Sequence, residues 1–256
     1  LSKKSYSIED PVEYKMVGVS QISVQRNANE RDSSGFTAAM RVVLRADPDI
    51  VMVGEVRDTE TSSLLKTMVQ SGHQVMTTVH AASAIDIIQR LTSSEMGMPR
   101  ETIAARNFLS ALVYQRLIAK LCPHCKIKAL EAGDDLFPPQ TRDILRTKFG
   151  LKPESMFITN PNGCAACDGY GTKGVTVVAE VIIPDNTILK MLREGKDVEA
   201  EEYWRSTRRT DFSDPDTWGK TALEHALYKA HIGMVDPLVV QDQFEPFEIY
   251  NLVEIA

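Results

Sequence analysis

Two carboxylates and a histidine each follow a separate apolar segment of the chain. If these segments are strands of one parallel sheet, the three side chains lie close together. The run Ile50–Val53 has four apolar residues without alternation, which is typical of a strand covered on both faces, and Glu55 follows it. Glu9 and His80 follow two further strand-like segments. If these strands are parallel neighbours, the three side chains converge at the carboxyl edge, where open α/β sheets bind ligands. Carboxylates there can hold Mg²⁺ through water and activate an attacking water, and a histidine can contact a phosphate oxygen.

Each of these residues also has a structural interpretation. Glu9 could cap a turn, Glu55 could pair with Arg57, and a single histidine at a strand end is more often a hydrogen-bonded core residue. Arg41 and Arg45 lie four residues apart on one face of a predicted helix, which suits either phosphate or subunit-interface contact, or a solvated face with salt bridges.

All four cysteines fall into two CxxC pairs, Cys122/Cys125 and Cys164/Cys167, separated by 38 residues. Two such pairs can complete the tetrahedron of thiolates that structural Zn²⁺ takes. The alternatives are redox dithiols or a disulfide framework, which a chain of this size does not need. We therefore predict a zinc site in which the intervening segment loops out and His124 is no ligand.

Two glycine-containing segments imitate phosphate-binding motifs. Gly169–Gly174 spells GxGxxG, but it follows a cysteine pair and precedes a strand-like segment, whereas a dinucleotide-binding fingerprint follows a strand and opens a helix. Gly219-Lys220-Thr221 resembles the end of a P-loop, but Asp214 stands where its first glycine would be. Thr221 is better interpreted as a helix N-cap, with Glu224 completing a capping box. The sequence contains no GxxxxGK[ST] motif.

Composition limits the classes of protein to consider. With 256 residues and 43% apolar residues, the chain can form one large domain or two modest ones. A net charge of −6 argues against non-specific nucleic-acid binding as its main activity. No apolar run is long enough to span a membrane and no signal peptide opens the chain, so we expect a cytoplasmic protein.

The order of predicted elements indicates an α/β fold in three parts. Strand and helix patterns alternate along the first part of the chain, which describes βαβ units. The expected strands are Ser5–Ile8, Ile50–Val53 and Val75–Val79, and Gln21–Gln25 adds a possible edge strand or hairpin. These helical patterns are Phe36–Leu44, Thr61–Gln70, Ala84–Glu95 and Thr102–Leu121. We expect a core at 1–121, a metal-binding subdomain at 122–183 that ends in a strand over Gly174–Ile183, and a helical region at 184–256. Within the last region, the expected helices are Thr187–Arg193 capped by Asn186, Glu199–Thr207 and Thr221–His231.

Several segments, in order, resemble the secretion ATPases that drive type II secretion and type IV pilus assembly. The resemblance covers about residues 5–183. The similar segments are the Asp box at Ser7–Tyr14, the Walker B region at Met40–Asp58, the His box at Gly72–His80, the helix at Gln115–Cys122 that leads into the first zinc knuckle, and the second knuckle at Gly163–Cys167 with Gly169–Gly174 and Glu180.

The resemblance implies a RecA-like P-loop NTPase sheet in a homo-hexamer that hydrolyses ATP with Mg²⁺ at the cytoplasmic side of the inner membrane. It implies peripheral membrane association, an inner-membrane platform protein as partner, no specific nucleic acid, and pilus or pseudopilus assembly rather than retraction, because retraction ATPases lack the four cysteines. Glu9 would be the general base, Glu55 the ligand of a Mg²⁺-bound water and His80 the γ-phosphate contact. The further nucleotide-binding candidates are Asp10, Glu13, Arg41, Arg45 and Arg57.

The missing P-loop leads to two further expectations. The chain would be truncated just after the helix that follows Walker A, and alone it would hydrolyse ATP negligibly. The competing hypothesis is a non-enzymatic, zinc-stabilised interaction module on the same scaffold.

Overall fold

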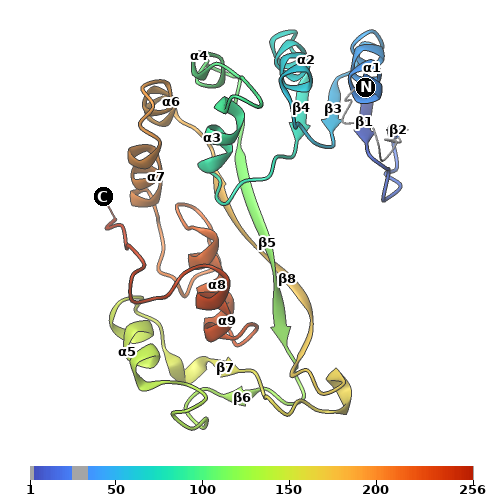
Figure 1. Cartoon of the computed structure of the whole chain (residues 1–256). Coiled ribbons are helices and arrows are strands. Elements are labelled where there is room, and N and C mark those ends of the chain that lie inside the picture. The colour runs from blue at the N-terminus through green and yellow to red at the C-terminus, as the bar shows by residue number, and fades with distance from the viewer. Residues whose placement is uncertain (1–2, 25–33, 256) are drawn as a thin grey trace. The chain divides into compact units, whose positions relative to one another are not determined.

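The structure is a computed structural model that describes residues 3–24 and 34–255, and it divides into two compact units (Figure 1). The first unit takes residues 1–110 and 184–197, and the second takes residues 111–183 and 198–256. These units cut the chain differently from the expected boundaries at 121 and 183. Each unit is described below by itself.

The first unit is built on a four-stranded parallel sheet with the order β2-β1-β3-β4. Its strands are β1 (Ser5–Glu9), β2 (Val19–Ser23), β3 (Ile50–Val53) and β4 (Gln74–Thr77). The parallel pairing of β2 with β1 makes it an edge strand and excludes a hairpin with β1. In β3, Val51 and Val53 are fully buried, but Ile50 and Met52 are only half-buried. The prediction that both faces of this strand are covered is therefore met on one face only.

Helices of the first unit accompany this sheet. They are α1 (Ser34–Leu44), α2 (Thr59–Gln70), α3 (Asp86–Thr92), α4 (Arg100–Ile103) and α6 (Asn186–Arg193). Helices α1 and α2 pack against each other, as Figure 1 shows. Helix α6 is capped by Asp185, whose carboxylate accepts the Ile188 N–H at 2.8 Å, and not by Asn186 as predicted.

The prediction of a helix over Thr102–Leu121 is wrong for most of that segment. Only α4 is helical there, and Leu112–Leu121 forms strand β5. It pairs antiparallel with β8 (Thr172–Ile182), whose strand character the sequence does predict. Leu, Gln, Arg and Lys favour helix intrinsically, but pairing with a valine-rich partner strand overrides this preference, because strand formation depends on tertiary context.

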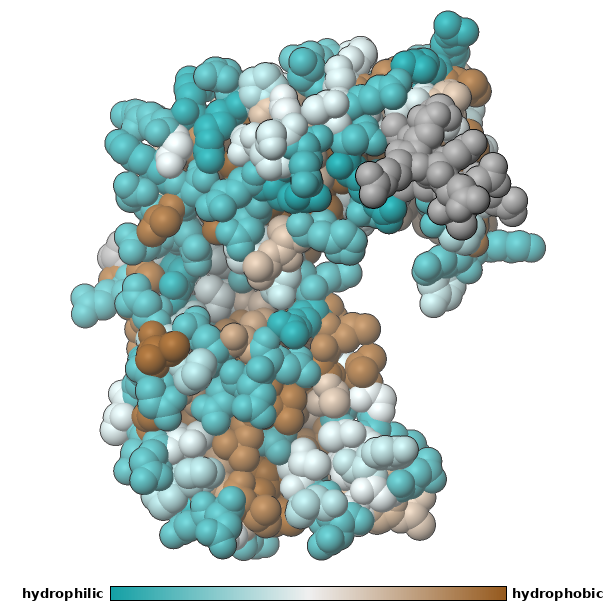
Figure 2. All heavy atoms as spheres, viewed as in Figure 1, coloured by the Kyte–Doolittle hydropathy of each residue, from teal (hydrophilic) through white to brown (hydrophobic). Residues whose placement is uncertain are grey.

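The two strands β5 and β8 have one face toward the core and one apolar face that remains exposed. Ile118 and Val178 are fully buried, whereas Leu117 and Val175 on the opposite face are 62% and 55% exposed. Figure 2 shows hydrophobic surface where Figure 1 places these two strands.

The segment between the cysteine pairs does not simply loop out. It forms β6 (Ile127–Lys128), α5 (Pro139–Thr147), the 3₁₀ turn η1 (Pro153–Ser155) and β7 (Phe157–Ile158). Its apolar residues share one core with the C-terminal helices: Phe149 meets the rings of Phe212 and Phe247 at centroid distances of 5.8 and 5.4 Å. This shared core explains why residues 122–183 do not separate from the tail as an independent subdomain.

The tail contributes α7 (Asp197–Ser206), α8 (Ala222–His231) and α9 (Pro237–Gln243), the last of which the sequence reasoning missed. Thr221 caps α8 with Glu224 in a capping box, as predicted. The neighbouring Lys220 is buried and donates to the carbonyls of Asp211 and Asp214, so it has a structural role here. Within residues 3–24 and 34–255, no helix is both long and apolar enough to cross a membrane.

Candidate functional site

The predicted acidic site lies at the carboxyl edge of the parallel sheet. Glu9 is the last residue of β1, and Glu55 and His80 follow β3 and β4 by two and three residues. Hydrogen bonds continue past the strand ends, from the Gly54 N–H to the Ile8 carbonyl at 2.8 Å and from the Val56 N–H to the Thr78 carbonyl at 3.2 Å. Because β1, β3 and β4 are parallel neighbours, Glu9, Glu55 and His80 all lie at the same edge of the sheet, as the sequence predicts.

Glu55 is the central group of this edge. Its Oε1 atom lies 3.4 Å from the Nε2 atom of His80, and its other oxygen pairs with the guanidinium of Arg57. The hydrogen bond to Glu55 raises the pKa of Arg57 above its ordinary value, against a smaller opposing effect of burial. The Glu55 side chain is 19% exposed and the His80 side chain 91%, so the histidine is accessible to a ligand and is no core residue.

Glu9 is oriented by two neighbours that sequence reasoning missed. Its Oε1 atom accepts hydrogen bonds from the Ser7 hydroxyl at 2.5 Å and from the Gln21 amide at 3.0 Å. Both donors lie on the strands β1 and β2, which pair in register at Ser7 and Gln21. No local signal identifies Gln21, because its contact with Glu9 depends on the pairing of two strands. The geometry can hold one carboxylate oxygen in place while the other remains available for chemistry.

Gly54 allows the strand ends to approach each other closely. A Cβ atom at this position would lie 3.0 Å from the Ile8 carbonyl oxygen and 3.4 Å from the Glu9 Cα atom. A side chain here would therefore press on the backbone that carries Glu9.

The structure gathers only some of the other predicted nucleotide-binding residues. Asp10 and Glu13 are exposed in the segment after β1, and the charge of Asp10 contributes to the raised pKa of Arg57. Arg41 pairs instead with Glu60 of α2 at 2.7 Å. Arg45 follows the end of α1 and precedes β3 by five residues, which puts it on the amino-terminal side of the sheet.

Asp58 lies near the predicted ligand-binding edge in sequence, but its carboxylate caps α2. It accepts the Thr61 N–H at 2.8 Å, which satisfies one of the free donors at the helix start. The sequence signal for this role is an aspartate directly before the helical pattern.

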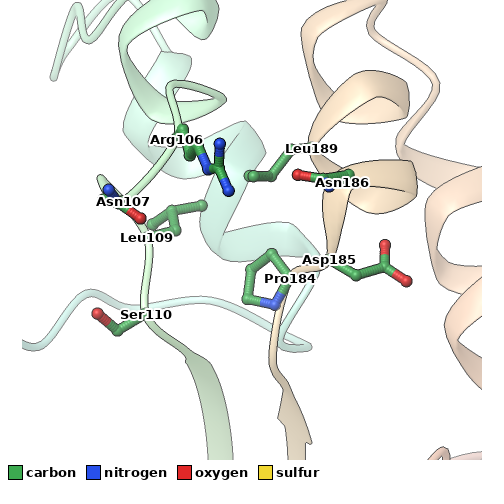
Figure 3. A pocket seen from close by; sticks show the side chains of 8 residues that line it. All are labelled: Arg106, Asn107, Leu109, Ser110, Pro184, Asp185, Asn186 and Leu189. Atoms are coloured by element: carbon green, nitrogen blue, oxygen red, sulfur yellow. The ribbon is translucent and has the colours of Figure 1, made fainter.

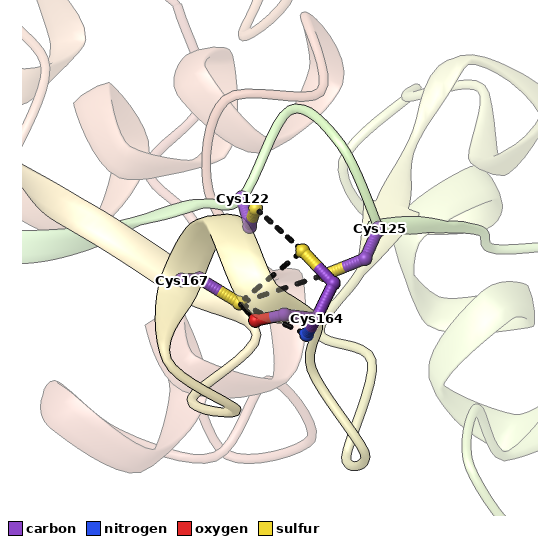
Figure 4. A group of neighbouring side chains, drawn as sticks. All are labelled: Cys122, Cys125, Cys164 and Cys167. Atoms are coloured by element: carbon purple, nitrogen blue, oxygen red, sulfur yellow. Dashed lines mark hydrogen bonds between the residues drawn. The ribbon is translucent and has the colours of Figure 1, made fainter.

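The four cysteines form a cluster in the second unit (Figure 4). The Sγ atoms are 3.8 Å apart for Cys122 and Cys164, 3.8 Å for Cys125 and Cys167, and 3.7 Å for Cys164 and Cys167. All four lie within 4.8 Å of one another. A tetrahedral ion with bonds of about 2.3 Å requires sulfurs about 3.8 Å apart, whereas a disulfide requires about 2.05 Å. The cluster therefore fits a tetrahedral metal ion and contains no disulfide.

The protonation of the cluster also suits a cation. Burial raises the pKa of Cys167, but N–H groups of Cys164 and Gly171, each 3.2 Å from its sulfur, outweigh this and bring the pKa down to about 6. Burial and the neighbouring sulfurs raise the pKa of Cys125 to about 12. One thiolate thus forms easily and a further one is disfavoured, so a full set of thiolates needs a positive ion between them.

Glycines of the GxGxxG segment let the chain turn tightly next to this cluster. Gly169 and Gly171 have φ angles of +82° and +70°, and a Cβ atom at Gly171 would lie 2.3 Å from the Asn160 carbonyl oxygen. The segment follows the 3₁₀ turn η2 (Ala165–Cys167) and leads into β8. His124 is exposed and is not a member of the cluster.

Glu180, which the family resemblance includes, has a structural position in the second unit. Its buried carboxylate accepts the Ala222 N–H at 3.0 Å, at the first turn of α8. A negative charge at a helix N-terminus is stabilised by the helix dipole.

A further cleft of about 430 Å³ lies in the first unit beside the start of α6 (Figure 3). Polar side chains of Arg106, Asn107 and Asn186 line it, while Asp185 points away from Arg106. None of the predicted site residues lines this cleft.

Known proteins resemble this chain over most of its length. The family model described as "Type II/IV secretion system protein" matches residues 2–225. The type IV pilus assembly ATPase PilB of Thermus thermophilus is 34% identical over 91% of this chain and 23% of its own length. The type II secretion system ATPase E of Vibrio cholerae is 32% identical over 86% of this chain and 41% of its own length. The chain thus spans well under half the length of these relatives.

Solved structures share the fold. The pilus retraction motor PilT with bound ADP superimposes with a TM-score of 0.58 at 22% identity, over 94% of this chain and 52% of its own. The Legionella pneumophila ATPase DotB gives a TM-score of 0.55 at 17% identity, over 94% of this chain and 51% of its own.

Proposed function

Because this chain belongs to the family of type II/IV secretion system proteins, we propose that it is part of an ATP-hydrolysing motor that powers assembly of a type IV pilus or a type II secretion pseudopilus. The observation that carries this proposal is the placement of Glu9, Glu55 and His80 at the carboxyl edge of one parallel sheet, with Glu55 and His80 3.4 Å apart. Two carboxylates and an accessible imidazole at such an edge suit phosphoryl transfer to water.

Each residue of the edge has a proposed role. Glu55 holds a water molecule of the Mg²⁺ shell, and Glu9, oriented by Ser7 and Gln21, is the general base that takes a proton from the attacking water. His80 donates to a γ-phosphate oxygen. The guanidinium of Arg57 pairs with Glu55 and compensates its negative charge while no Mg²⁺ is bound.

The remaining candidates have less direct roles in this proposal. Asp10 and Glu13 bind the nucleotide or its Mg²⁺ from the exposed segment after β1. Arg41 and Arg45, which lie apart from the Glu55 edge, act as phosphate contacts for a neighbouring subunit.

Zn²⁺ is the proposed ion of the cysteine cluster. Cys122, Cys125, Cys164 and Cys167 would hold it, and four thiolates leave no open position, so the ion would supply structural support and no reaction chemistry.

The whole motor is proposed to be a RecA-like homo-hexamer that acts in the cytoplasm. It would bind peripherally at the inner membrane through a platform protein, without specific nucleic acid. Support comes from the family and from the parallel sheet.

The alternative is a zinc-stabilised interaction module without nucleotide. It is favoured by one observation, which is that the sequence contains no GxxxxGK[ST] segment to cradle phosphates. For the same reason, we propose that the isolated 256-residue chain hydrolyses ATP negligibly.

The test uses the longest gene product that contains these residues, with a Glu55→Gln variant. Nucleotide affinity, measured with a fluorescent ATP analogue, should change less than about threefold, while hydrolysis should fall by a factor of about a hundred or more. Glu101→Gln, an exposed change on α4 of the same unit, is the matched control. Unchanged hydrolysis in Glu55→Gln would remove Glu55 from the mechanism, and no nucleotide binding by the parent protein would favour the interaction module.

A further inference from the structure

A cleft of about 460 Å³ in the second unit lies beside the first cysteine pair. Its apolar lining comes from Leu121 and Pro123, on either side of Cys122, and from Ile232 and Met234 after α8. The Leu121 N–H donates to the Met234 carbonyl at 2.9 Å, which ties these two segments together. Ile232 is 45% exposed, so part of this apolar lining faces solvent. A volume of this size is typical of clefts that hold a ligand or a few side chains.

Three lysines from separate segments surround this lining: Lys120, Lys126 and Lys173. The Lys126 ammonium donates to the Gly233 carbonyl at 2.7 Å and lies 4.1 Å from the centre of the Phe157 ring. The Lys173 ammonium donates to the Ala166 carbonyl at 2.9 Å. Two of the three cations are thus held in place by the protein.

No carboxylate among the described residues forms an ion pair with these lysines. Their known partners are carbonyl groups and an aromatic ring. The whole chain has 35 acidic and 29 basic residues, so a group of three lysines without an ion-paired carboxylate is opposite in sign to the net charge. Such a local excess of one sign attracts and orients a partner of the other sign.

We propose that this cleft is a docking site for an acidic peptide segment of a partner protein, with apolar side chains that enter the cleft between the lysines. Charge complementarity argues for the acidic residues, and the Leu121, Pro123, Ile232 and Met234 lining argues for the apolar ones. Nucleic acid is a poorer match, because a phosphate backbone requires a longer basic track and leaves an apolar floor unused.

The docking site goes beyond the proposed motor function and does not depend on it. It needs neither ATP nor an intact Glu55 edge. It would give the protein a charge-dependent contact next to the cysteine cluster. There, the Cys122 N–H donates a 2.9 Å hydrogen bond to the Gly171 carbonyl.

The test is selection from a library of short peptides in which acidic, neutral polar and apolar residues are randomised. The bait is the 256-residue chain, compared with a Lys120→Glu/Lys173→Glu variant. Lys128→Glu/Lys152→Glu, at exposed positions of the same unit outside the cleft, is the control with the same change of net charge. Circular dichroism checks that all three chains are folded.

We expect peptides rich in both acidic and apolar residues to bind the parent and the control, with an affinity about tenfold or more lower for Lys120→Glu/Lys173→Glu. Ile232→Ser should also weaken binding by about threefold or more without a change of charge. The proposal is overturned if selected peptides bind the two double variants equally. It is also overturned if no peptide is selected, or if vesicles of phosphatidylcholine and phosphatidylglycerol bind in a Lys120- and Lys173-dependent way while peptides do not.

Discussion

Replacing Cys164 by serine should weaken metal binding and destabilise the second unit. Its Sγ atom lies 3.8 Å from that of Cys122 and 3.7 Å from that of Cys167, so it occupies one corner of the sulfur tetrahedron. A serine hydroxyl is a poor ligand for Zn²⁺ and stays protonated where a thiol ionises.

The magnitude follows from linkage between metal binding and folding. Loss of a partner that only supports a ligand lowers metal affinity about 10- to 100-fold, so loss of a ligand itself should cost at least about 100-fold. When free zinc exceeds both dissociation constants, a 100-fold loss removes about 2.7 kcal/mol from the free energy of unfolding. The whole unit should respond, because Cys122 directly follows Leu121 of β5 and its N–H donates to Gly171, next to the start of β8.

The assay uses the two tryptophans of the chain, Trp204 and Trp218, which both lie in the second unit. Their fluorescence in urea gives the free energy of unfolding of that unit, and atomic absorption gives the zinc content of the purified chain. His124→Asn is the matched control, because His124 is exposed and outside the cluster, and should leave both quantities unchanged. If Cys164→Ser retains one equivalent of zinc and the parent stability, the metal assignment is wrong.

Three other predictions concern stability. Arg100→Ala should lower the stability of the first unit by about 2 kcal/mol, because it removes two hydrogen bonds of 2.7 Å to the largely buried Asp197. Backbone hydrogen exchange in α6 should therefore become faster, and unchanged exchange would contradict this prediction. Burial lowers the pKa of His225, whose Nδ1 accepts the Ala179 N–H at 3.1 Å, so the unfolded state binds the proton more strongly. The contribution of His225 to the free energy of unfolding is therefore complete above pH 6.5 and is lost as the pH falls from 6.5 through the lowered pKa. In urea titrations, the stability of His225→Gln should depend less on pH than that of the parent. An identical pH dependence would refute the assignment. Phe247→Ala should cost about 3–5 kcal/mol by tryptophan fluorescence, since Phe247 is fully buried, and a loss below about 1 kcal/mol would argue against the shared core.

Two exposed changes serve as controls for these stability measurements. Arg90→Ala breaks a surface ion pair with Glu95, and Tyr170→Ala removes a side chain that is 77% exposed. Each should change the free energy of unfolding by less than about 1 kcal/mol.

The amino-acid sequence by itself determined the features whose causes are local. The capping box of Thr221 and Glu224 needs only two residues three positions apart, and the strand at Ile50–Val53 needs only a short apolar run. The two CxxC pairs predict a four-sulfur cluster because each pair already points two sulfurs at one place. The order of strand ends likewise predicts that Glu9, Glu55 and His80 share an edge, because parallel strands align their carboxyl ends.

Only the tertiary structure decided the features that depend on distant partners. The segment Leu112–Leu121 has helix-favouring residues, and it is a strand because β8 supplies its hydrogen bonds and the core of the second unit buries Ile118. Gln21 orients Glu9 only because β2 lies next to β1 in a particular register. The segment between the cysteine pairs belongs to the same unit as the tail because Phe149, Phe212 and Phe247 complete one core, and burial of apolar surface is non-directional and leaves no short sequence pattern.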